Sequence, residues 1–165
     1  MNSHSAKGLQ LSTPTDTTIV LTRAFQAPRK LVWEAFTHPP KMRRWMLAPP
    51  GCTLARCECD ARVGGVLSLA WKADDGAVMT LRGVFTEVVM HERMVHSETM
   101  ALGTGEVFGA MLETHEFTET GGVTTMRITQ AFESKDARDD VLASSMDQCM
   151  EAGFLQLDAM LAQPA

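Results

Sequence analysis

The chain has 165 residues, of which 45% are hydrophobic and 21% are charged, and its formal net charge is −5. This size and composition are typical of one globular domain with a real hydrophobic core. An acidic chain without a basic run argues against a nucleic-acid partner, and no apolar run reaches the roughly 18 residues of a membrane span.

The N-terminal segment 1–16 is polar and lacks the apolar centre of a secretory signal. We therefore predict a flexible N-terminal tail over residues 1–16, a single domain over residues 17–163 and a cytoplasmic location. The four cysteines lack the spacing of a zinc or redox motif, so we expect reduced thiols.

The first elements of the domain are a strand and two short helices. Thr17–Gln26 alternates apolar and polar residues, although Arg23 interrupts the apolar face. Pro28 suits the first turn of a helix, which the two prolines after His38 end. A second short helix is predicted over Lys41–Met46.

A meander of six strands follows, separated by short turns rich in glycine and aspartate. The predicted strands are Thr53–Ala61, Val66–Ala73, Val78–Val89, Met94–Met100, Ala110–Thr118 and Thr124–Phe132. Such short connections favour antiparallel pairing.

The last segment, Asp136–Leu161, carries apolar residues at helical spacing and predicts one helix roughly 40 Å long. The predicted fold class is therefore α+β: a curved seven-stranded antiparallel sheet wrapped around a long C-terminal helix, with two short helices after strand one.

Several short motifs in this order resemble one known superfamily. They are Arg23-Ala24-Phe25-x-Ala27-Pro28, Val32-Trp33-x-Ala35-Phe36-Thr37-x-Pro39, Trp45, Asp60-x-Arg62-x-Gly64-Gly65, Gly83-x-Phe85-x-Glu87-Val88, Gly121-Gly122-x-Thr124 and Ser145-Met146. The chain resembles the SRPBCC proteins (START-like, Bet v-like), and within them the branch of the activator of heat-shock-protein (Hsp) ATPase homologues. The resemblance implies a helix-grip fold with a cavity between sheet and helix. It implies no single activity, because fold does not determine function.

Alternation along two strands places four polar residues on the inward face of the predicted sheet: His96, Glu98, Glu113 and His115. A symmetric hairpin about Gly105 would pair Glu98 with Glu113 and His96 with His115. These residues could act as general acid and base or bind a metal such as zinc. In the competing interpretation they are ordinary polar strand residues. No ligand spacing supports a metal, so the prediction is no metal and no cofactor.

The first functional hypothesis is a protein that binds a hydrophobic or amphipathic small molecule between sheet and final helix. The predicted ligand-binding residues are Trp45, Leu67, Leu69, Trp71, Met79, Leu81, Phe85, Met111, Phe117, Met126, Ile128, Met146, Cys149, Met150 and Phe154. The alternatives are a cyclase- or hydrolase-type enzyme that uses the His/Glu cluster and, by family analogy, a partner of a chaperone ATPase. A homodimer is compatible with the sequence, but no sequence feature decides it.

Overall fold

The computed structural model describes residues 8–164, which form one eight-stranded antiparallel sheet and four helices. The strands are β1 (Gln10–Ser12), β2 (Thr18–Phe25), β3 (Cys52–Cys59), β4 (Val66–Ala73), β5 (Val78–Val89), β6 (Arg93–Leu102), β7 (Val107–Thr120) and β8 (Val123–Ala131). The helices are α1 (Arg29–Thr37), α2 (Pro39–Trp45), α3 (Lys135–Ala143) and α4 (Met146–Leu161). The strand order is β1-β2-β8-β7-β6-β5-β4-β3.

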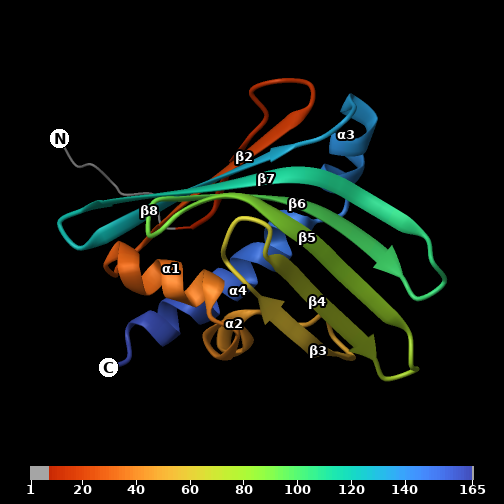
Figure 1. Cartoon of the computed structure of the whole chain (residues 1–165), viewed down its shortest axis with the longest axis horizontal. Coiled ribbons are helices and arrows are strands. Elements are labelled where there is room, and N and C mark those ends of the chain that lie inside the picture. Colours follow the sequence, from red (N-terminus) through yellow and green to blue (C-terminus); the bar gives the residue numbers. More distant parts are fainter. Residues whose placement is uncertain (1–7, 165) are drawn as a thin grey trace.

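The sheet curves around α4, and α1 and α2 lie beside α4 on the same side of the sheet (Figure 1). This arrangement confirms the predicted α+β helix-grip fold. The strand count differs by one, because Gln10–Ser12 pairs with Val20–Thr22 at the sheet edge. That short strand lies inside the predicted flexible tail, and residues 1–7 lie outside the described part of the chain.

The C-terminal helix is broken, where the sequence predicted one continuous helix over Asp136–Leu161. Ser145 adopts a left-handed conformation with φ 60°, between the end of α3 and the start of α4. The Ser144 hydroxyl donates a hydrogen bond of 2.6 Å to the Val141 carbonyl. Serine side chains compete in this way for backbone groups, so α3 ends at Ser144, and the left-handed Ser145 separates it from α4.

The core lies between the inward face of the sheet and the helices α1, α2 and α4. Phe154 of α4 contacts the rings of Phe25, Phe36 and Trp45 at centroid distances of 5.6 to 6.1 Å. Gly153 of α4 packs against α2, where a Cβ would lie 3.4 Å from the Trp45 carbonyl oxygen. This end of the domain is therefore closed by packed aromatic side chains.

Arg23 explains the interruption in the first apolar strand. It lies on the same buried face as Leu21 and Phe25, and its guanidinium bonds both Glu151 and Asp158 of α4 at 2.7 to 3.1 Å. Burial opposes its charge, but these carboxylates outweigh that cost and raise the pKa of Arg23. The arginine thus joins β2 to α4.

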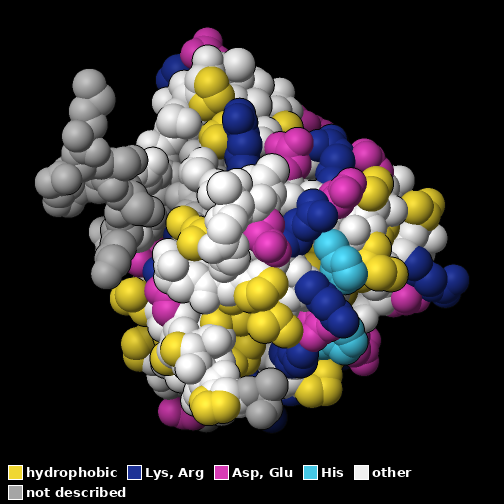
Figure 2. Space-filling model, turned by 90° about the vertical axis from the view of Figure 1, so that its left-hand side faces the viewer, with side chains coloured by type: hydrophobic (Ala, Val, Ile, Leu, Met, Phe, Trp, Pro, Cys, Tyr) yellow, Lys and Arg dark blue, Asp and Glu magenta, His cyan; other side chains and the backbone are white. Residues whose placement is uncertain are grey.

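No helix among the described residues combines the length and hydropathy needed to cross a membrane. On the face shown in Figure 2, basic and acidic side chains are interspersed with apolar ones.

Candidate functional site

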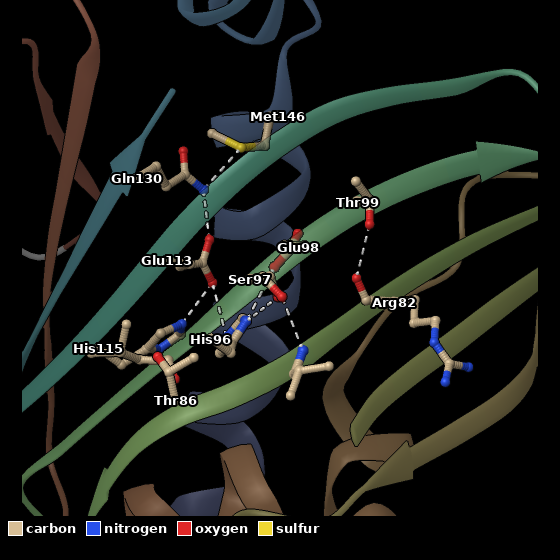
Figure 3. A network of polar contacts seen from close by, with 12 residues as sticks. Arg82, Thr86, His96, Ser97, Glu98, Thr99, Glu113, His115, Gln130 and Met146 are labelled. Carbon is tan, nitrogen blue, oxygen red and sulfur yellow. Dashed lines mark hydrogen bonds and ion pairs between the residues drawn. The ribbon is translucent and has the colours of Figure 1, made fainter. Parts of the chain in front are cut away.

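The four polar candidates lie on two neighbouring strands, where the sheet faces α4 (Figure 3). His96, Glu113 and His115 are buried, and Glu98 is half-buried with a side chain only 12% exposed. Alternation along β6 and β7 explains why all four share this face.

The predicted pairing of these residues is wrong by two positions. His96 lies opposite Glu113, while Met94 lies opposite His115 and Met111 lies opposite Glu98. The hairpin turn runs from Leu102 to Glu106, and a bulge on β7 near Gly109 adds one residue. A shift of two residues keeps every side chain on its face, which is why the inward set is unchanged.

Glu113 is the centre of the cluster. One of its oxygens, Oε1, lies 2.6 Å from His115 Nε2 and 3.8 Å from His96 Nε2. The other, Oε2, accepts a hydrogen bond of 2.8 Å from Gln130 on β8. The Gln130 amide also lies 3.5 Å from Met146 Sδ, which ties the cluster to α4.

The backbone fixes the orientation of His96. Its Nδ1 lies 3.1 Å from the Ser97 carbonyl oxygen, which can only accept, so Nδ1 carries the proton. Gly83 makes room for this carbonyl, because a Cβ there would lie 1.9 Å from it. Burial lowers the pKa of His96, so its ring is neutral near pH 7 with the Nε2 lone pair directed toward Glu113.

The two glutamates have pKa values shifted in opposite directions. Burial raises the pKa of Glu98 well above its usual value, and the nearby Glu113 carboxylate raises it further. Burial also opposes the charge of Glu113, but hydrogen bonds from His115 and Gln130 and the two histidines together lower its pKa to about 2. Near neutral pH, Glu113 is therefore the carboxylate and Glu98 the better proton donor.

These shifts predict opposite pH dependences for the two carboxyl groups. The stability that Glu113 contributes is present above its unfolded pKa and is lost as pH falls from about 4.5 toward 2. Glu98 contributes stability below its unfolded pKa and loses it as pH rises through its raised folded value. We expect Glu98→Gln to raise the free energy of unfolding at pH 7, and Glu113→Gln to lower it.

Urea unfolding of both variants and the parent at pH 4 and pH 7 checks this prediction. The gain from Glu98→Gln should shrink at the lower pH, where the native carboxyl is already protonated. A Glu98→Gln variant that is less stable than the parent at both pH values would contradict it.

The predicted ligand-binding residues divide into three groups. Nine are buried in the packed core: Trp45, Leu67, Leu69, Leu81, Phe85, Phe117, Met126, Ile128 and Phe154. Five are half-buried: Trp71, Met79, Met111, Met146 and Met150. Cys149 is exposed, contrary to its predicted inward position. At about 100° per residue it points roughly 90° away from the centre of the buried stripe of α4, outside the face that packs on the sheet.

Two surface depressions among the described residues lie elsewhere on the molecule. One of about 440 Å³ lies between Pro39 and the β3–β4 turn, and the other, of similar volume, lies between Leu9 and Leu155. None of the fifteen predicted residues lines either depression.

Sequence reasoning missed three residues on the inward face. Gln130 continues the alternation of Met126 and Ile128 and could have been found from it. Met100 continues the series of His96 and Glu98, and is half-buried. Phe108 pairs with Met100 only because the β7 bulge shifts the alternation, so no sequence pattern indicated its side.

Comparison with known proteins agrees with the fold. A protein of Rhodobacter sphaeroides is 27% identical, with a TM-score of 0.82 over 93% of this chain and 97% of that one. Protein Ms6760 of Mycobacterium smegmatis has a TM-score of 0.81 at 21% identity, over 94% of this chain and 98% of that one. Among curated proteins no sequence match was found.

A family model described as "Activator of Hsp90 ATPase homolog 1-like protein" matches residues 26–162. This match spans most of the chain and confirms the SRPBCC resemblance, including the predicted branch. The chain therefore belongs to the Activator of Hsp90 ATPase homolog 1-like family.

Proposed function

We propose that this protein binds a small amphipathic molecule on the inward face of its sheet. The apolar body of the guest lies against an inward patch of half-buried side chains, and its polar group meets the His/Glu cluster. The inward patch consists of Trp71, Met79, Met100, Met111, Met146 and Met150. The nine fully buried residues predicted to contact the ligand are packed core in this proposal.

The observation that carries the proposal is a set of buried polar atoms without a partner. Among the described residues, these are Trp71 Nε1, His115 Nδ1 and Gln130 Oε1. Buried polar groups are nearly always hydrogen-bonded, and leaving one unpaired costs about 1–3 kcal/mol. Two of the three atoms belong to the cluster and the third belongs to the patch. A guest that supplies both donors and acceptors would satisfy them.

The side chains of the patch can adapt to guests of different shapes. Five of its six members are methionines. Four of these lie on β6, β7 and α4: Met100, Met111, Met146 and Met150. Unbranched, polarisable thioethers repack around varied apolar surfaces. Methionine is also frequent in the whole chain, with 12 residues.

The cluster favours an uncharged polar group on the guest. It holds two glutamates, and the described ion pairs of Glu98 and Glu113 are with histidine rather than lysine or arginine. A guest carboxylate would be repelled by Glu113, whereas a hydroxyl or phenol can both donate and accept.

A thermal-shift panel tests this proposal with matched compounds in the presence of EDTA. Three apolar skeletons are compared, each carrying either a hydroxyl or a carboxylate group. The pairs are decanol and decanoate, para-phenylphenol and para-phenylbenzoate, and a steroid that carries a hydroxyl group and the same steroid with a carboxylate in its place. A ligand at 100 times its Kd stabilises the folded state by roughly 2.7 kcal/mol. We expect compounds with one of the three apolar skeletons to raise the Tm. The hydroxyl compound of that pair should do so at a lower concentration than the carboxylate.

A matched pair of variants locates the binding. Met111→Gln, in the inward patch, should weaken binding of the selected compound by about tenfold, equivalent to roughly 1.4 kcal/mol. Met90→Gln is the control, because Met90 is 70% exposed in the turn after β5. The proposal would be contradicted if none of the six compounds shifted the Tm, or if the carboxylates consistently bound better. Either result would favour the chaperone-ATPase hypothesis.

The opposite pKa shifts of the two glutamates favour an enzyme as the second candidate. Groups whose environments separate their pKa values are suited to act as acid and base. In this candidate, Glu98 protonates the bound substrate and Glu113, with His115, accepts a proton. Turnover of a bound polyketide-like or aromatic compound should be lost in Glu113→Gln and kept in Glu116→Gln, which alters the neighbouring ion pair with Arg93 on the other face.

A further inference from the structure

We propose that His96, Glu113 and His115 form a binding site for one divalent transition-metal ion, with zinc as the metal that fits the donors best. One ligand atom from each residue lies within 4.8 Å of the other two, and all three residues are buried. Two imidazoles and one carboxylate are a donor set of zinc sites that leave a fourth position open.

The distances between donor atoms fit an ion after small side-chain movements. Around tetrahedral zinc, with bonds of about 2.0–2.1 Å, the donor atoms lie roughly 3.3 Å apart. Glu113 Oε1 lies 2.6 Å from His115 Nε2, which is closer than this separation, and 3.8 Å from His96 Nε2, which is farther. A cation between the three would replace the proton shared by Glu113 and His115.

The tautomer of His96 independently indicates a cation at this position. Because Nδ1 donates to the Ser97 carbonyl, the unprotonated Nε2 faces a carboxylate oxygen. A nitrogen lone pair and a carboxylate oxygen are both acceptors, so they attract each other only through a proton or a cation between them. Metal-binding histidines in proteins typically donate their second nitrogen to a backbone carbonyl in this manner.

The surroundings of Glu113 also match those of a metal ligand. Gln130 donates to Oε2, leaving Oε1 for the ion and holding the carboxylate in place. Such supporting hydrogen bonds orient the ligands and raise metal affinity. The Gln130 side chain is 2% exposed, and its Oε1 has no partner among the described residues. That oxygen could accept from a water or guest hydroxyl in the open position.

The expectation of no metal rested on the absence of a ligand spacing pattern. The donors come from two strands, and only Glu113 and His115 are close in sequence. The inference extends the proposed function, since an ion here would bind the oxygen of the guest's polar group. It does not depend on that function, because the organic compounds are tested in EDTA and the metal is tested alone.

Titration of the full-length protein with cobalt(II), and competition between the protein and a chromophoric chelator for zinc(II), test the site. We expect one ion per chain. The visible cobalt bands should be those of nitrogen and oxygen donors, without the thiolate charge-transfer band that the free Cys52, Cys57, Cys59 or Cys149 would produce. Zinc should also raise the Tm of the wild-type protein.

Variants assign the ligands. His96→Gln and His115→Gln should each weaken zinc binding by roughly a hundredfold or more, whereas the control His38→Gln, at an exposed histidine, should leave it unchanged. Circular dichroism identifies variants that do not fold. If neither cluster variant folds, the cobalt spectrum of the wild-type protein still tests the site. No cobalt bands, bands of thiolate type, or zinc affinity unaffected in both folded cluster variants would overturn the proposal.

Discussion

Replacing Phe154 by alanine is expected to lower the free energy of unfolding by about 3–5 kcal/mol. Phe154 is 1% exposed and lies at the point where α4, both short helices and β2 meet. Its removal leaves a cavity among rings that are fixed by their own packing, so the surroundings can collapse only in part. Urea unfolding, followed by far-ultraviolet circular dichroism, measures the loss.

The matched control for this prediction is the next residue along the helix. Leu155 is 58% exposed, so Leu155→Ala should change the free energy of unfolding by no more than about 0.5 kcal/mol. Equal losses in the two variants would mean that α4 does not face the sheet through Phe154.

Arg23→Ala is expected to cost about 3 kcal/mol, the second-largest effect. The guanidinium is 3% exposed, makes four hydrogen bonds to Glu151 and Asp158, and lies 4.9 Å from the centroid of the Phe25 ring. Breaking a buried ion pair typically costs about 3–5 kcal/mol. We expect the lower end, because the side chains of Glu151 and Asp158 are 27% and 40% exposed and can regain water.

Thermal unfolding of Arg23→Ala beside Arg127→Ala checks this value. Arg127 is also a strand arginine, but it is exposed on β8 and its removal should cost little. Arg23→Lys should fall between them, because a lysine cannot form the forked contact with two carboxylates. If Arg23→Ala were as stable as the parent, the ion pairs would not hold α4 against β2.

Strong local patterns allowed most of the fold to be predicted. Val66–Ala73 and Val78–Val89 match β4 and β5 residue for residue, because glycine and aspartate turns mark their ends. The break at Ser145 was missed, since the apolar spacing continues through it. The edge strand β1 was missed because its three residues, Gln10, Leu11 and Ser12, are too few to show an alternation.

The sequence predicted which residues of the candidate site face inward, but not which of them lie opposite each other. The period of two in a strand assigns side chains to faces, so the inward position of His96 and Glu113 follows from the sequence. Which residues lie opposite each other depends on the turn and the bulge, which alternation does not report. The central role of Gln130 and the tautomer of His96 depend on contacts between strands. These contacts distinguish a cluster built around Glu113 from four separate polar residues.

A nitrogen–proton NMR spectrum of the histidine side chains tests directly whether the cluster contacts the polar group of a guest. It is recorded in EDTA with and without the hydroxyl compound selected by the thermal-shift panel. We expect the ring signals of His96 and His115 to move on binding, while that of the exposed His38 stays in place. A compound that binds and stabilises the protein without moving the His96 or His115 signals would contradict it.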